Sequence, residues 1–167
     1  MTESTETSTS DQIRRLEEEG EVAADYLEEL LDIVDLDGDI EIDVDHGRAA
    51  VAVVAEGDAT ALNRRVGPDG SVLDAVQELT RLAVQTRTGE RSRLMLDIAG
   101  HREARKAALA IVAREAIDRV KESGTAVSLN PMNPFERKVV HDVVGAAGLV
   151  SDSAGVEPER YVVVHPA

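Results

Sequence analysis

The sequence predicts an α+β protein built from two small modules. Three observations support this fold class. Apolar residues recur at helical spacing in some segments and alternate with polar residues in others, so both helices and strands are expected. Gly100 separates one series of such segments from a second series. The chain of 167 residues is 43% hydrophobic and 31% charged, which suits one ordinary core or two small ones.

The first series of segments is predicted to run helix, strand, strand, helix, helix, strand. Residues 1–10 are Thr, Ser and Glu with one Met, so we expect a disordered, solvated tail there. Acidic residues alternate with Ile40, Ile42 and Val44, which is the period of a half-buried strand, and His46-Gly47 turns the chain into a hairpin. The expected elements are a helix over 11–34, strands over 39–45 and 48–55, a short helical segment over 57–65, a helix over 71–87 and a strand over 91–99.

The second series, over 100–167, is predicted to form a smaller α+β module. Its clearest signal is a helix start: Asn133 suits the N-cap, Pro134 the first helical position and Glu136 the third, where its side chain closes a capping box. The expected elements are a helix over 101–121, a short strand over 126–129, a helix over 134–146 and strands over 149–151 and 160–165.

Several classes of protein are excluded by what the sequence lacks. Without cysteine there is no disulfide framework and no thiolate metal site. No apolar stretch approaches the length that spans a membrane, and the N-terminus lacks the basic and apolar regions of a secretory signal, so we expect a cytoplasmic protein. The four histidines lack metal-ligand spacing and no enzyme motif is present, so no catalytic residue, metal or cofactor is expected.

The formal charge of −15 is concentrated at one end of the chain. Residues 1–58 contain 19 acidic and 3 basic residues, a net charge of −16, whereas residues 59–167 contain 14 acidic and 15 basic residues, a net charge of +1. Salt screens charges over about 8 Å at physiological ionic strength, so a local basic surface can act despite a distant acidic one. The net charge therefore does not exclude a nucleic-acid partner.

A Gly-x-x-Gly loop lies between two of the predicted helices. Its glycines allow a nucleic-acid backbone to approach closely, and amides at the start of the following helix can meet phosphate oxygens. The same tetrapeptide is also a common turn, and this plainer interpretation stays open. The candidate residues are the loop itself and the two arginines before it: Gly67, Pro68, Asp69, Gly70, Arg64 and Arg65.

An arginine and a histidine four residues apart form the second candidate site. Arg137 and His141 fall together beyond the edge of the apolar arc of their helix, so we expect them on an exposed stripe, with Lys138 nearby. The arginine offers an always-charged planar fork for phosphate, and the histidine can donate to phosphate or stack on a base. An ordinary solvated helix face is the alternative.

Two segments of the sequence resemble known nucleic-acid-binding modules. Residues 11–99, with Val66-Gly67-Pro68-Asp69-Gly70-Ser71-Val72-Leu73-Asp74-Ala75-Val76-Gln77, resemble a type II KH domain, although KH loops usually place a basic residue between the glycines. The segment Pro131-Met132-Asn133-Pro134-Phe135-Glu136-Arg137-Lys138-Val139-Val140-His141 resembles the R-3-H domain, and Gly100-His101-Arg102-Glu103-Ala104-Arg105 resembles the start of its first helix. The two modules in this order resemble the bacterial Jag family, also called SpoIIIJ-associated or KhpB.

This resemblance implies a three-stranded sheet with helices on one face, followed by a small α+β domain, in a cytoplasmic RNA-binding protein that is not an enzyme. It implies single-stranded RNA, and potentially single-stranded DNA, as ligand, a small single-KH-domain protein or a second copy as partner, and a role in cell-envelope and elongation control. The implied binding residues are Arg137, His141, Lys138, Arg102, Arg105 and the loop residues with Arg64 and Arg65. The alternative function is a protein-interaction or dimerisation module whose KH loop is disabled by Asp69.

Overall fold

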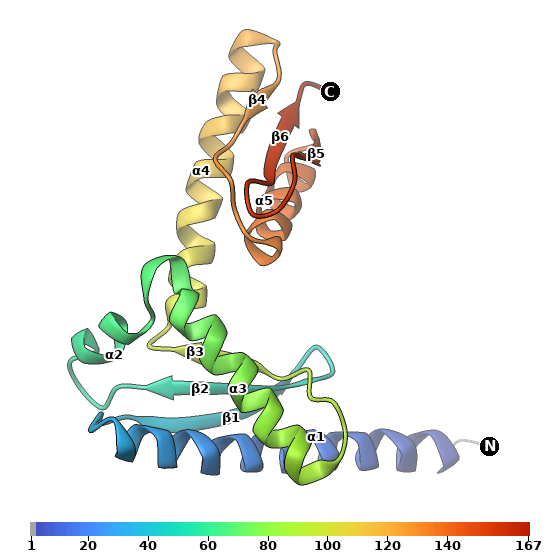
Figure 1. Cartoon of the computed structure of the whole chain (residues 1–167). Coiled ribbons are helices and arrows are strands. Elements are labelled where there is room, and N and C mark those ends of the chain that lie inside the picture. Colours follow the sequence, from blue (N-terminus) through green and yellow to red (C-terminus); the bar gives the residue numbers. More distant parts are fainter. Residues whose placement is uncertain (1–2) are drawn as a thin grey trace. The chain divides into compact units, whose positions relative to one another are not determined.

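The computed structural model describes residues 3–167, with side chains from residue 9 onward (Figure 1). The chain divides into two compact units, the first ending at Arg102 and the second covering Glu103–Ala167. No helix within residues 3–167 has the length and apolar character needed to cross a membrane.

The first unit contains the predicted order of helices and strands. Its elements are α1 (Glu3–Ile33), β1 (Asp39–Asp45), β2 (Arg48–Val54), α2 (Thr60–Arg65), the 3-10 turn η1 (Pro68–Gly70), α3 (Ser71–Thr88) and β3 (Met95–Ile98). The sheet has the order β1-β2-β3, with β1 antiparallel and β3 parallel to β2. His46 and Gly47 both have positive φ, as the tight turn of a two-residue hairpin requires, so the predicted hairpin is confirmed.

The core of the first unit lies between its sheet and its helices. Helix α1 packs against β1 and β2, and α3 packs against α1 and β3 (Figure 1). Burial alternates along β2, where Ala49, Val51 and Val53 are buried. Leu27 of α1 and Leu73 of α3 join them in one apolar cluster. Burial of these side chains, at about 25 cal/mol per Å² of apolar surface, is what stabilises this layer.

Two boundaries in the first unit differ from those predicted by four residues or more. Helix α1 begins at Glu3 rather than at residue 11, so the prediction of a disordered tail is wrong for residues 3–10, and residues 1–2 lie outside the described residues. Strand β3 begins at Met95 rather than at residue 91. Just before β3, the Leu94 amide donates to the buried Ser92 hydroxyl, which itself bonds to Glu19 of α1.

The second unit is a small helix-and-sheet layer with its own core. Its elements are α4 (His101–Ser123), whose first two residues belong to the first unit, β4 (Val127–Ser128), α5 (Pro134–Ala146), β5 (Val150–Ala154) and β6 (Tyr161–His165). The sheet is antiparallel with the order β4-β6-β5. Val162 and Val164 of β6 are buried against Val140 and Val144 of α5 and Ala113 of α4.

Candidate functional site

The start of α5 is fixed by the capping box that the sequence predicts. The Asn133 Oδ1 atom accepts from the Glu136 amide at 2.9 Å, and the Glu136 Oε2 atom accepts from the Asn133 amide at 3.0 Å. Glu136 is only 4% exposed, and its Oε1 atom accepts from the Arg105 Nε atom at 2.6 Å. Arg105 of α4 is therefore tied to the first turn of α5, which fixes the position of the helix that carries the second candidate site.

Arg137 is buried, which contradicts the prediction that it lies on an exposed stripe. Its side chain is among the core residues at 8% exposure. The Nη1 atom donates to the Met132 carbonyl at 2.7 Å, and the Nη2 atom donates to the Glu157 carboxylate at 2.5 Å. Glu157 lies in the loop between β5 and β6, so the exposed stripe expected from the helix alone is covered by a segment twenty residues further along.

His141 lies one turn after Arg137 and is half-buried against β5. Its Nδ1 atom is 2.7 Å from the Ser151 hydroxyl, and its Nε2 atom is 2.9 Å from the Ser153 hydroxyl. These serines are two residues apart on one strand and therefore share a face. A neutral imidazole has one donor and one acceptor nitrogen, so one serine donates to the ring and the other accepts from it. The pair of hydroxyls fixes the ring plane.

Lys138 is the exposed cation of α5. Its ammonium lies 2.8 Å from the Asp142 carboxylate, one turn along the helix, and both side chains are largely exposed. Exposed pairs of this kind contribute roughly 0.3–0.5 kcal/mol, so the ammonium can exchange this carboxylate for another anion at small cost.

Arg102, at the start of α4, is bound within the first unit. Its Nε atom donates to the Leu96 carbonyl at 2.7 Å, and its Nη2 atom donates to the Gln77 side chain at 3.0 Å. Nη2 also lies 3.3 Å from the Asp74 carboxylate. These contacts give Arg102 a structural role that joins α3, β3 and α4.

The Gly-x-x-Gly loop is a tight turn whose glycines are required by geometry. Gly67 has φ +80°, and a Cβ there would lie 2.5 Å from a methyl carbon of Val72. Gly70 has φ +77°, and its Cβ would lie 3.0 Å from the His101 ring. A side chain at Gly67 is therefore disfavoured by strain and by space, and one at Gly70 is disfavoured mainly by strain.

The amides at the start of α3 are not available as the sequence suggested. The Gly70 amide donates to Gly67, and the Ser71 amide donates to Pro68. The amides of Val72 and Leu73 both donate to the Val66 carbonyl, at 3.0 and 3.1 Å. The expectation of free amides is therefore wrong for these four positions, because the turn closes on its own backbone.

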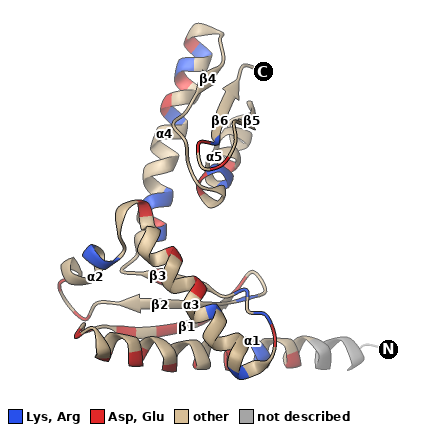
Figure 2. Cartoon of the chain, in the orientation of Figure 1, with Lys and Arg blue, Asp and Glu red and all other residues tan. Residues whose placement is uncertain are grey.

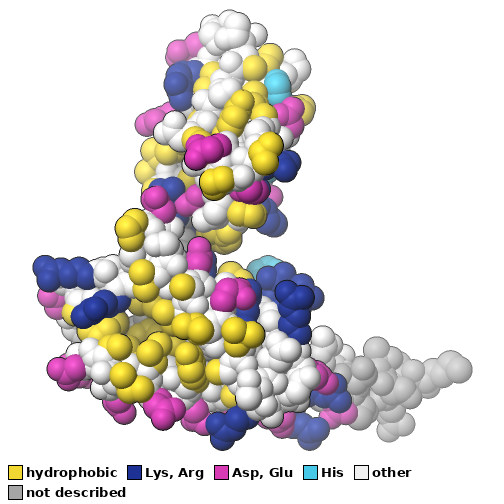
Figure 3. All heavy atoms as spheres, in the orientation of Figure 1, with side chains coloured by type: hydrophobic (Ala, Val, Ile, Leu, Met, Phe, Trp, Pro, Cys, Tyr) yellow, Lys and Arg dark blue, Asp and Glu magenta, His cyan; other side chains and the backbone are white. Residues whose placement is uncertain are grey.

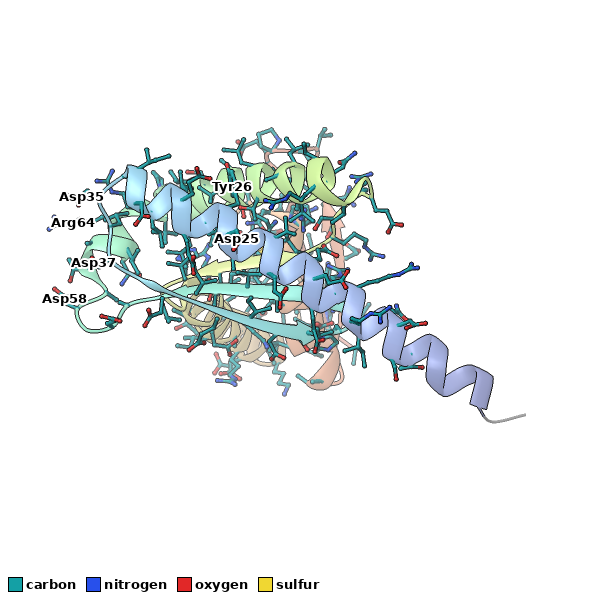
Figure 4. All side chains as sticks on the ribbon, turned by 90° about the horizontal axis from the view of Figure 1, so that it is seen from below. Asp25, Tyr26, Asp35, Asp37, Asp58 and Arg64 are labelled. Atoms are coloured by element: carbon teal, nitrogen blue, oxygen red, sulfur yellow. The ribbon has the colours of Figure 1, made fainter. Side chains whose placement is uncertain are left out.

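The charge around the loop is mixed. Asp69 is exposed at the tip of the loop, and Arg64 and Arg65 are exposed just before it, without an ion pair to any residue that the structure describes. Asp35, Asp37 and Asp58 lie at the same end of the first unit as Arg64 (Figure 4). Hydrogen bonds from the Thr60 side chain and amide lower the pKa of Asp58, so that carboxylate stays charged. The nearby acids weaken the field of the two arginines.

Other candidate chemistry is not assembled in the described part of the chain. Within residues 3–167, no three histidine, aspartate or glutamate side chains gather in a way that could hold a metal ion. Sequence reasoning missed Arg119 as a candidate, although Arg105, Val112 and Arg119 are spaced by seven and therefore share one stripe of α4. That spacing is the signal that could have found it.

Comparison with known proteins identifies the second unit. Residues 107–166 match the R-3-H domain family, so this part of the chain is an R-3-H domain.

The chain is also similar to proteins named RNA-binding protein KhpB. The protein of Clostridium symbiosum is 32% identical over 143 residues, which are 85% of this chain and 64% of the relative. That of Streptococcus pneumoniae serotype 2 is 29% identical over 83% of this chain and 42% of the relative. That of Bacillus subtilis is 27% identical over 76% of this chain and 62% of the relative. The chain thus spans between two fifths and two thirds of the length of these relatives.

Proposed function

We propose that the chain is a single-stranded RNA-binding protein of the KhpB type, in which a type II KH module precedes the R-3-H domain. The observation that carries this proposal is the R-3-H match over residues 107–166, on the unit that holds the capped helix with Arg137 and His141. The names of the relatives and the element order of the first unit support it. No reaction is proposed. A cytoplasmic location is an expectation from the sequence, and a role in cell-envelope and elongation control follows only from the resemblance.

The R-3-H domain supplies the stronger contact in this proposal. Glu157 holds Arg137 from an exposed loop, with 51% of its side chain accessible. An RNA phosphate that replaces this carboxylate exchanges one charge-assisted hydrogen bond for another, so the net cost of the exchange is small. Lys138 adds an exposed cation on the same helix, and the serine that accepts from the His141 ring keeps its hydroxyl hydrogen for ribose or phosphate.

The KH loop supplies a weaker contact. Four backbone amides of the loop and the helix start already donate hydrogen bonds within the turn. Arg64 and Arg65 are therefore the main groups that attract phosphate, and the negative charge of Asp69 opposes them. At Gly67 and Gly70, the RNA backbone then makes van der Waals contact with the backbone of the turn, and the fit depends on shape rather than on charge. Binding by the whole chain should be salt-sensitive and only modestly selective for sequence.

A fluorescence-anisotropy titration tests this function. A labelled single-stranded RNA is titrated with the wild type and with the Arg137→Ala, His141→Ala double variant at about 50 and 200 mM salt. Single-stranded DNA of the same sequence is the second ligand. We expect wild-type binding that falls with salt and is at least ten-fold weaker in the variant.

Because Arg137 is buried, circular dichroism must show that the double variant is folded, and Lys138→Ala provides a surface variant that keeps the fold. Salt-independent binding, or no binding by the wild type, overturns the proposal. If the wild type and the folded variants bind RNA with equal affinity, the binding site is the KH loop and not the helix that carries Arg137 and His141.

One observation favours a second function, which is self-association through α3. Val72, Leu79 and Leu82 are 43%, 52% and 57% exposed, and with Ala75 they follow the alternating spacing of three and four that helix pairs use. Figure 3 shows hydrophobic side chains gathered on the first unit. The four residues of the stripe are uncharged, so a second copy can dock there without pairing like charges on the stripe itself.

The mass in solution tests this second function. If α3 is the interface, light scattering gives twice the chain mass, and Leu79→Asp gives the single mass with the fold intact. A wild-type monomer excludes self-association, and capture of a purified single-KH-domain protein by that monomer, lost in Leu79→Asp, assigns the stripe to a different partner.

A further inference from the structure

The second unit has a hollow that the proposed function does not use. It lies between α4 and the segment that leads from β4 to α5, and its volume is about 390 Å³. Sites for small ligands range from roughly 300 to 1,000 Å³, so the hollow has room for one nucleobase with part of its sugar. All of its lining residues belong to the second unit.

The floor of the hollow is apolar. Leu129 and Met132 are buried beneath it, and Val112 of α4 is 39% exposed at its side. This chain has only three aromatic residues, Tyr26, Phe135 and Tyr161, and none of them lines the hollow. In other RNA-binding proteins, unstacked bases stack on aromatic side chains. Here an apolar floor that includes a methionine sulfur can take that place against the flat face of a base.

Two arginines border this floor. Arg105 and Arg119 lie seven residues to either side of Val112, so all three share one stripe of α4, with the two arginines about 21 Å apart along the axis. Arg119 is exposed and has no ion pair with any described residue. Arg105 uses its Nε atom for Glu136, which leaves its two terminal nitrogens available.

The carboxylate that binds Arg105 of the lining is already neutralised. Glu136 accepts from Arg105 and from the Asn133 amide, and is 4% exposed. It therefore presents little negative charge to an anion at the rim. Ser128 and Asn130 add neutral hydrogen-bonding groups to the lining, which suit the edge of a base.

We propose that this hollow is a nucleotide subsite of the RNA-binding surface. It takes one unstacked base against Leu129, Met132 and Val112, while Arg105 and Arg119, about 21 Å apart along α4, hold phosphates further along the strand on either side of that nucleotide. A ligand with an apolar face between two anionic groups fits this arrangement, and single-stranded RNA has that pattern. The inference rests on the proposed function and deepens it by adding Arg119 and the apolar floor to the site.

A matched pair of variants on α4 tests the subsite. Arg119→Ala removes the rim cation, and Arg114→Ala removes an exposed cation from the same helix that does not line the hollow. Val112→Asp places a carboxylate beside the floor. Each variant is titrated as the full chain against labelled single-stranded RNA at several salt concentrations.

We expect Arg119→Ala to lower affinity about five- to ten-fold at 50 mM salt and to reduce the salt slope by about one. Val112→Asp should weaken binding at least as much, and Arg114→Ala should change it less than two-fold. Equal losses for Arg119→Ala and Arg114→Ala overturn the subsite, as does wild-type affinity in Arg119→Ala. If the wild type binds no RNA, the proposed function is wrong and the nucleotide subsite is wrong with it. Capture of an acidic peptide by that same protein, lost in Arg119→Ala, would then assign the hollow to a protein ligand.

Discussion

Arg137 has a structural role in the second unit and a proposed role in RNA binding, and different substitutions separate the two. The side chain joins the Met132 carbonyl to the Glu157 carboxylate and is 8% exposed, so its loss leaves a buried carbonyl without its donor. We expect Arg137→Ala to lower the free energy of unfolding by about 2–4 kcal/mol, measured by urea titration. Lys138→Ala is the control and should change it by less than about 0.5 kcal/mol. Equal stability of the two variants would show that Arg137 is not a structural clamp.

A substitution at Glu157 tests whether Arg137 exchanges the Glu157 carboxylate for an RNA phosphate. Glu157→Gln keeps the size of the side chain but removes the charge that competes with phosphate. We expect this variant to bind single-stranded RNA about three- to ten-fold more tightly at low salt, because the charge-assisted bond that must break is replaced by a weaker one. Glu159→Gln, two residues along the same loop, controls for the change in net charge. Equal gains in both variants would contradict a specific exchange at Arg137.

At the scale of the element, α5 depends on its first turn. The Asn133 cap is local in sequence, since both of its hydrogen bonds join residues three apart. We expect Asn133→Ala to cost about 1 kcal/mol, and Asn133→Asp, which keeps an acceptor, to cost much less. Thermal unfolding followed by circular dichroism measures both, and a loss of the same size in both variants would argue against capping as the cause.

In the proposed function, the Gly-x-x-Gly loop binds RNA only weakly, because Asp69 repels phosphate. Asp69 is exposed at its tip, so its charge can be reversed without disturbing the core. We expect Asp69→Lys to strengthen RNA binding several-fold, because a cation then stands where an anion opposes phosphate. Asp69→Asn separates removal of repulsion from gain of attraction. Unchanged affinity in both variants would mean that RNA does not reach this loop.

Sequence reasoning succeeded where structure is set by neighbours in the chain. The Asn133-Pro134-Glu136 helix start and the His46-Gly47 hairpin depend on residues within one turn, and both are confirmed. It failed where distant segments meet. Arg137 is bound by Glu157, twenty residues further along, and the segment before the shortened β3 is bound through Ser92 to Glu19, 73 residues away. Helical periodicity locates the apolar arc of a helix but not the loop that covers its edge.

At the scale of the whole molecule, charge differs between the two units. The first unit, to Arg102, contains 24 acidic residues against 10 lysines and arginines, a net charge of −14. The second contains 9 against 8, a net charge of −1. Acidic residues are distributed along α1 and β1 (Figure 2). A polyanion is therefore repelled less by the R-3-H domain than by the first unit, which agrees with the assignment of the main contacts to α4 and α5.

The most direct test of this account is photo-crosslinking of the full chain to a single-stranded RNA that carries one 4-thiouridine, followed by mapping of the linked peptides. We expect crosslinks in the second unit, around α5 and in the hollow that Val112 and Met132 line, and their loss at about 500 mM salt. Crosslinks confined to the Gly67–Gly70 loop, or crosslinks that persist at high salt, would contradict it.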